Sequence, residues 1–230
     1  MTTTLKGRDA EYYETYKKVI ISLIDDLIKK DMIKFWYGTP EDANSVKVVH
    51  GSVNTAQRLQ KLTDIVDDQN WQDFEKDLAK YGLTDPDIAG IYFDLLVYNM
   101  LIQFELLKNM LLKVLHKKVY KQTDTVGKVT AKTKIDGKEP LGKLLDKLEI
   151  ISPNNGLKQC INNDLRNAIA HFWYWLENVQ FYYANNSDLK NPKTLTLAQF
   201  LIEFKKQGLL TKCFGEDGIG RIKRFKIGIV

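Results

Sequence analysis

The most apolar stretch of the chain, Ile91–Leu115, reads IYFDLLVYNMLIQFELLKNMLLKVL. Its polar interruptions are Asp94, Gln103, Glu105, Lys108 and Lys113. A membrane-spanning helix needs about 20 mostly apolar residues with few charges, and these interruptions are too frequent for one. We therefore expect this stretch to form most of a long core helix, about 86–120, in a soluble protein without membrane contact.

Segments on both sides of this helix carry apolar residues at spacings of three and four, which is typical of amphipathic helices. The further predicted helices are 9–35, 54–81, 141–150, 157–183 and 197–207. Residues 121–140 differ, because β-branched and polar residues alternate there. Either a small β-hairpin or a basic loop fits that pattern. With many helical signals and almost no strand signal, the sequence predicts an all-α bundle that forms one domain, 1–230.

The composition of the 230 residues excludes several classes of protein. A hydrophobic share of 44% and only 5 prolines do not fit a disordered chain or a fibre. The net charge of +5 permits an anionic partner without requiring one. Cys160 and Cys213 are too few for a disulfide framework and lack C-x-x-C spacing, and residues 1–8 show no apolar run of a signal peptide. We therefore expect a cytoplasmic protein.

Residues 164–175 read DLRNAIAHFWYW and contain the most informative polar residues of the chain. Arg166 is followed by Asn167, and His171 comes five residues after the arginine. Five residues advance about 7.5 Å and about 140° along a helix, so both side chains flank one edge and can converge on a ligand. A second copy across a two-fold axis could complete such a site. A solvated arginine and a histidine that bonds a buried carbonyl also produce this spacing, so a purely structural role stays open.

The string LRNAIAH at 165–171 resembles the signature of the HEPN superfamily, in which Arg is followed by four residues and His, commonly with Asn, Asp or His directly after the Arg. The resemblance extends over about 86–185: a long apolar helix, a short helix beginning Leu141-Gly142, and then the motif helix. It implies a HEPN-like helical bundle with an insertion at 121–140. Residues 1–85 would be an N-terminal helical extension and 209–230 a basic C-terminal tail.

The resemblance implies a metal-independent endoribonuclease that works as a homodimer, with the motifs of both subunits facing each other across a cleft. RNA supplies its own nucleophile, the 2′-hydroxyl. His171 would act as general acid or base, because histidine changes protonation near neutral pH. Arg166 would hold a phosphate, and Asn167 would donate to a phosphate oxygen or orient His171. No cofactor and no metal are expected.

The implied setting is cleavage of single-stranded RNA in a toxin, antiviral or stress response, with an antitoxin or regulatory protein as a further partner. One toxin subgroup carries a modified Tyr two residues after the His, but Trp173 stands there in this chain, which puts that modification in doubt. The alternative, from a different class, is a non-catalytic helical module that binds RNA or a partner protein.

Some members carry an acidic residue on an earlier helix, and Glu105 is the first candidate and Asp94 the second. An exposed helical position without a function is the simpler interpretation of Glu105. The predicted substrate-binding residues are Lys117 and Lys118 in the basic stretch 117–143, and Arg221, Lys223 and Arg224 in the tail. A solvated loop is the simpler interpretation of the stretch 117–143, whereas a tail packed on the bundle explains the C-terminal residues equally well.

Large aromatic residues follow the motif at 172–175 and recur at 181–183. Burial in the core and at a dimer face is the main interpretation of these residues, and base stacking is a secondary one. His50 and His116 are interpreted as ordinary surface residues.

Overall fold

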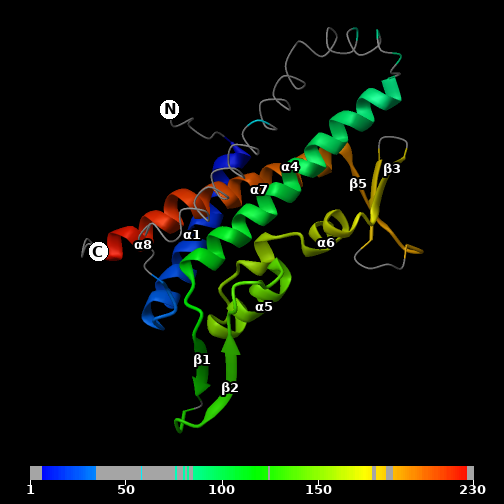
Figure 1. Cartoon of the computed structure of the whole chain (residues 1–230). Coiled ribbons are helices and arrows are strands. Elements are labelled where there is room, and N and C mark those ends of the chain that lie inside the picture. Colours follow the sequence, from blue (N-terminus) through cyan, green and yellow to red (C-terminus); the bar gives the residue numbers. More distant parts are fainter. Residues whose placement is uncertain are drawn as a thin grey trace. The chain divides into compact units, whose positions relative to one another are not determined.

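The computed structural model in Figure 1 describes residues 7–34, 58, 76, 80, 82, 85–123, 125–177, 180–184 and 189–226. The predicted helix 54–81 falls almost entirely outside the described residues, and His50 falls outside them altogether. The chain divides into two compact units. The first unit contains 1–39, 107–163 and 205–230, and the second contains 40–106 and 164–204. That all of 1–230 forms one domain stays a prediction.

Helices alternate with two antiparallel sheets, so the predicted all-α, HEPN-like helical bundle is wrong and the fold is mixed. The described elements are α1 Arg8–Lys29, α4 Asp85–Val114, β1 Val119–Thr123, β2 Val129–Lys134, α5 Leu141–Ile151, the 3-10 turn η2 Lys158–Cys160, α6 Asn163–His171, β3 Tyr174–Glu177, β4 Gln180–Tyr183, β5 Lys193–Thr196, α7 Leu197–Cys213, the π-helical turn η3 Phe214–Gly218 and α8 Ile219–Lys226.

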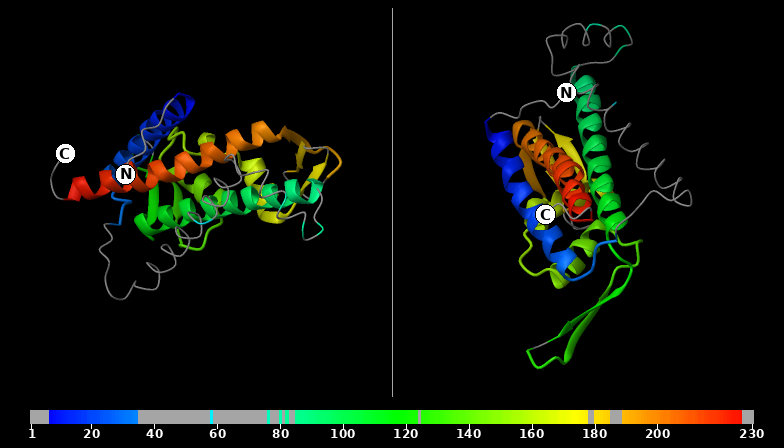
Figure 2. Two further views of the ribbon diagram at one scale, coloured as in Figure 1. Left: turned by 90° about the horizontal axis from the view of Figure 1, so that it is seen from above. Right: turned by 90° about the vertical axis from the view of Figure 1, so that its left-hand side faces the viewer.

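In the first unit, α1 buries one apolar face and lies beside η3 and α8, as Figure 2 shows. Its buried residues are Tyr16, Ile20, Leu23, Ile24 and Leu27. Gly218 of η3 allows the close approach. A Cβ atom at this position would lie 2.9 Å from Ile20 Cγ2 and 3.0 Å from Ile24 Cδ1. Because both isoleucines are buried, any larger side chain would overpack this contact.

For the stretch 121–140 the sequence allowed either a hairpin or a loop, and the structure shows the antiparallel hairpin β1–β2. Lys121 lies directly opposite Lys132, and Val119 opposite Lys134. The long helix that precedes the hairpin ends at Val114 rather than near 120, because the chain becomes a strand at Val119.

The second unit contains the three-stranded antiparallel sheet β3–β4–β5, and the buried Phe181 lies at its centre. The Phe181 ring lies 5.0 Å from the Phe93 ring of α4 and 4.9 Å from the Phe200 ring of α7, measured between centroids. The predicted helix 157–183 is therefore confirmed only over Asn163–His171, since a 3-10 turn at Lys158–Cys160 precedes this segment and β3 and β4 follow it. The large aromatic residues within 174–183 fit the spacing of a helix as well as the alternation of a strand. The sequence of this segment alone therefore does not distinguish the two, and it forms strands because it pairs with β5.

The C-terminal part is more helical than predicted. The helix predicted over 197–207 continues through Gly208 to Cys213, and 214–226 are helical as well, so most of the predicted tail belongs to α7, η3 and α8. In α4, Gly90–Val114 is long and apolar enough to cross a membrane, but 56% of its most apolar part is buried within the protein. Burial of this kind is typical of a core helix.

Candidate functional site

The nine-residue helix α6 carries the complete motif. Leu165, Ala168 and Ile169 are buried and fix the helix to the second unit through one face. Arg166 and Asn167 are half-buried, and His171 is exposed at the last helical position. In the first turn, Asp164 forms an ion pair with Lys193 of β5. A carboxylate at this end also complements the helix dipole, so the motif lies on an anchored element.

Arg166 is the half-buried cation of the motif. Its Nε is buried and has no hydrogen-bond partner among the described residues. Burial lowers the pKa of the guanidinium below its usual value, and the nearby Glu105 carboxylate of α4 opposes that shift. Glu105 itself is exposed. Glu105, the first acidic candidate, is thus near enough to act on the charge of Arg166.

Asp94, the second acidic candidate, acts on a different residue. Tyr174 of β3 has a pKa above its usual value, mainly through burial, and the Asp94 carboxylate adds to this effect. The structure gives Asp94 no comparable effect on Arg166.

The His171 ring stacks on the ring of Trp173, with centroids 4.6 Å apart and planes 25° apart. Stacking of this kind restricts the orientation of an otherwise exposed imidazole. Trp173 was not among the predicted site residues. Its position two residues after the histidine is the sequence feature that could have indicated this contact. Together, α6 presents a cation that can hold an anionic group and an imidazole that can transfer a proton.

The predicted substrate-binding residues Lys117, Lys118, Arg221, Lys223 and Arg224 all belong to the first unit, whereas the motif belongs to the second. Two of them are engaged in ion pairs. Lys118 pairs with Asp31. Arg221 holds Asp25 through two hydrogen bonds, 2.7 Å from Nε to Oδ1 and 3.2 Å from Nη2 to Oδ2. The side chains of Lys117, Lys223 and Arg224 are exposed.

The hairpin carries a cationic surface that the sequence interpretation did not resolve. Lys121, Lys132 and Lys134 lie on its exposed face, which we call the hairpin lysine face. Their ammonium groups form no ion pair within the part of the chain that the structure describes. Directly opposed like charges destabilise a strand pair, so Lys121 and Lys132 are not explained by the stability of the hairpin. The alternation within 119–123 and 129–134 was the signal for this face.

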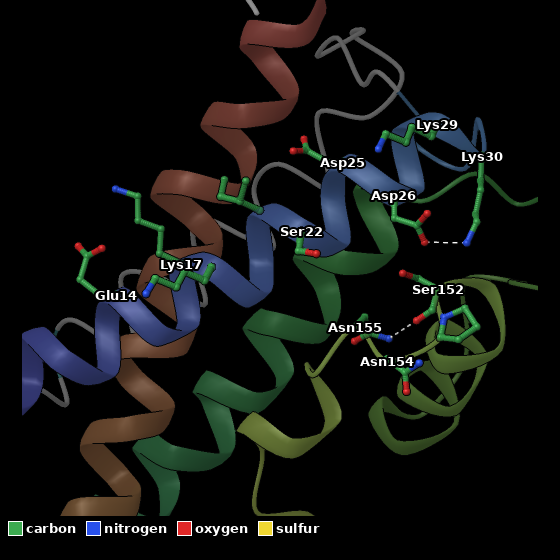
Figure 3. A pocket seen from close by; sticks show the side chains of 13 residues that line it. Glu14, Lys17, Ser22, Asp25, Asp26, Lys29, Lys30, Ser152, Asn154 and Asn155 are labelled. Atoms are coloured by element: carbon green, nitrogen blue, oxygen red, sulfur yellow. Dashed lines mark hydrogen bonds and ion pairs between the residues drawn. The ribbon is translucent and has the colours of Figure 1, made fainter.

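A concave region lies between α1 and the turn at 152–155 in the first unit (Figure 3). This groove has a volume of about 820 Å³ and contains none of the motif residues. Lys30 pairs with Asp26 at 2.7 Å, and Lys17 pairs with Asp217 at 3.2 Å. Because cations and carboxylates alternate along the groove, its charge selects no class of ligand.

The described residues include no group of three or more His, Cys, Asp or Glu side chains that could hold a metal ion. Comparison of the chain with protein-family models, with curated proteins and with solved structures gave no match. The functional assignment therefore depends on the chemistry of the motif on α6 and on its resemblance to the HEPN signature.

Proposed function

We propose that this chain is a metal-independent endoribonuclease of the HEPN type that cleaves single-stranded RNA, with Arg166 and His171 as its catalytic residues. The observation that carries the proposal is the arrangement on α6, where a half-buried arginine with an unpaired Nε and an exposed histidine share one anchored helix of nine residues. RNA needs little more from the protein, because its 2′-hydroxyl is the nucleophile.

In the proposed reaction the 2′-oxygen forms a bond to the adjacent phosphorus and the bond from phosphorus to the 5′-oxygen breaks. A base removes the 2′-hydroxyl proton, and an acid protonates the departing 5′-oxygen. The Arg166 guanidinium stabilises the charge on the phosphoryl oxygens. Asn167 donates to a phosphate oxygen or orients His171. The products are a 2′,3′-cyclic phosphate and a 5′-hydroxyl.

Glu105 is a positioning residue in this scheme. Its carboxylate acts on the Arg166 guanidinium, which is partly removed from water and therefore interacts with charges more strongly than an exposed group does. Glu105 keeps the arginine charged and oriented, and it does not itself touch the phosphate.

A homodimer completes the site, because one imidazole cannot supply both the base and the acid in a single displacement. A second copy of α6 across a two-fold axis supplies the second histidine. An exposed stripe on α4 fits such an interface. Ile91, Tyr98 and Glu105 recur every seven residues, which places them on one side of the helix. Ile91 and Tyr98 are large apolar side chains that are 38% and 52% exposed.

The hairpin lysine face is a separate RNA-binding surface of the first unit in this proposal, because exposed lysines attract phosphates. Lys117, Lys223 and Arg224 are further candidates for phosphate contacts. A role in toxin or antiviral defence, control by an antitoxin and a cytoplasmic location belong to the same proposal. A non-catalytic RNA-binding module is the alternative, and the lysine face is the observation that favours it.

The deciding experiment incubates the protein with single-stranded RNA in excess chelator and compares His171→Ala and Arg166→Ala with the wild type. We expect each variant to lose cleavage by about 100-fold or more, because acid–base catalysis and charge stabilisation each contribute at least that much. Mass spectrometry of the fragments should show 2′,3′-cyclic phosphate ends.

The matched controls His116→Ala and Arg8→Ala remove the same residue types elsewhere and should leave cleavage unchanged. RNA that binds tightly but stays intact with wild-type protein would support the binding module. Cleavage that survives His171→Ala would show that the catalytic assignment is wrong.

A further inference from the structure

Phe172, the residue directly after His171, has an unusual backbone conformation. It ends α6 with φ at 55°, in the left-handed region. The Trp173 N–H donates to the Ala168 carbonyl at 2.9 Å, and the Phe172 N–H donates to the Ile169 carbonyl at 3.4 Å. These two bonds define a Schellman motif, in which the residue at the Phe172 position is usually glycine and sometimes asparagine.

Helix α1 ends in the same motif, with a residue that adopts a positive φ more easily. Asp31 has φ at 52°, and Met32 and Asp31 donate to the Leu27 and Ile28 carbonyls at 2.8 and 2.9 Å. Asp and Asn enter this region easily, because a short polar side chain can bond locally, whereas a bulky residue is an outlier there. Phe172 therefore carries a conformational strain that Asp31 largely avoids.

Burial does not compensate for this strain. The Phe172 side chain is 68% exposed, the second-highest exposure among the large apolar side chains described. Its described ring contact is with Tyr174, at a centroid distance of 6.5 Å. Since glycine would relieve the strain at little cost in packing, the stability of the fold does not explain a phenylalanine here.

We propose that Phe172 stacks on a base of the bound RNA next to the scissile phosphate and so positions the substrate. The inference rests on the proposed ribonuclease site, because Phe172 is adjacent in the chain to His171. An exposed phenylalanine ring carries no charge to attract a phosphate, but it offers the flat apolar surface that bases stack on. Rings at 171 and 173 and rings at 172 and 174 already form two stacked pairs, so a base would extend the second pair.

The test uses Phe172→Gly. If Phe172 positions RNA, this variant should be more stable than the wild type but bind RNA more weakly. If Phe172 stabilises the fold, the variant should be less stable. We expect the melting temperature to rise by about 2–4 °C as the strain is relieved. Affinity for a short single-stranded RNA should fall about tenfold or more, since stacking on one aromatic residue accounts for such a factor. Asn154→Gly is the matched control. Asn154 also has φ at 60°, but asparagine tolerates this region, so its replacement by glycine in the first unit should leave both the melting temperature and RNA affinity nearly unchanged.

Affinity is measured in the His171→Ala background, so that the RNA stays intact, and each variant is tested with an RNA that carries one abasic nucleotide at successive positions. One abasic position should weaken binding most to the protein that keeps Phe172. On that RNA, Phe172→Gly should cause no further loss of affinity, because the base that stacks on the ring is already missing. Phe172→Tyr should restore affinity, and Phe172→Leu should not.

Three results would overturn the stacking proposal. The proteins with Phe172 and with Phe172→Gly could bind RNA equally well, or the ratio of their affinities could be the same on every abasic RNA. The third result is a loss of dimers for Phe172→Gly in sedimentation. The last result would assign the ring to the subunit interface. Wild-type protein that never cleaves RNA but shows the abasic-dependent loss contradicts the ribonuclease and supports stacking, so the two failures are distinguishable. If Phe172→Gly does not fold, Phe172→Asn replaces it, because asparagine also enters the left-handed region.

Discussion

At the scale of single residues, Glu139 is a buried carboxylate with both oxygens hydrogen-bonded. Its Oε1 accepts the Asp136 N–H at 2.8 Å and its Oε2 accepts the Gly137 N–H at 3.0 Å. Lys147 forms an ion pair with it as well. Burial alone would raise the pKa of Glu139, but Lys147 and the backbone donors outweigh this effect and hold the pKa well below its usual range.

This network predicts a pH dependence of stability. Because the folded-state pKa is lowered, the stabilisation is fully present above the ordinary glutamate pKa and is lost as pH falls below about 4.5. Glu139→Gln should lower the free energy of unfolding by about 1–3 kcal/mol at pH 7. The difference from the wild type should shrink as pH falls below about 4.5. Denaturant titrations at several pH values measure it, and a pH-independent difference would contradict the assignment to Glu139.

Arg166, Asn167 and His171 could be selected from the sequence because the choice needs only residue types and spacing. The strain at Phe172 could not be selected, because φ depends on where the helix ends. The electrostatic effect of Glu105 on Arg166 links residues 61 positions apart in the chain, and spacing within either helix does not predict it.

At the scale of elements, the hairpin lysine face gives the next prediction. Lys121→Gln together with Lys132→Gln should leave the fold intact or slightly more stable, because the opposed charges disappear. Affinity for single-stranded RNA should fall, and the slope of log affinity against log salt should decrease by about 0.7 for each phosphate that the variant no longer neutralises. Filter binding at several salt concentrations measures this slope.

The matched control for the hairpin is Lys34→Gln together with Lys205→Gln, which removes the same charge from exposed positions elsewhere in the first unit. If both double variants weaken RNA binding equally, the effect is one of net charge and the hairpin has no special role.

Elements with one clear period were predictable. The helix predicted over 141–150 corresponds to α5, because its buried leucines at 141, 144, 145 and 148 follow the helical spacing closely. Strands β3, β4 and β5 were missed because each has four residues, too few for alternation to be distinguished from helical spacing. Their stability comes from mutual pairing and from the aromatic rings around Phe181, which are tertiary features.

At the scale of the whole molecule, the two units share two helices. Residues 85–106 of α4 belong to the second unit and 107–114 to the first, and α7 divides at Phe204. The Arg166–His171 motif belongs to the second unit and the hairpin lysine face to the first. Loss of catalysis and loss of RNA affinity should therefore be separable by substitution.

The proposed dimer makes the last prediction. If each reaction needs one histidine from each subunit, a mixed dimer of wild type and His171→Ala is inactive. Mixing wild type with increasing His171→Ala at constant total protein should then reduce cleavage as the square of the wild-type fraction, because only dimers with two wild-type subunits act. The same titration with His116→Ala should cause no loss, since that variant keeps the motif. Subunit exchange is ensured by co-expression with two different tags. A linear decrease with His171→Ala would mean that a single subunit contains the whole site, and the acid and the base would then both have to be found within one copy of the second unit.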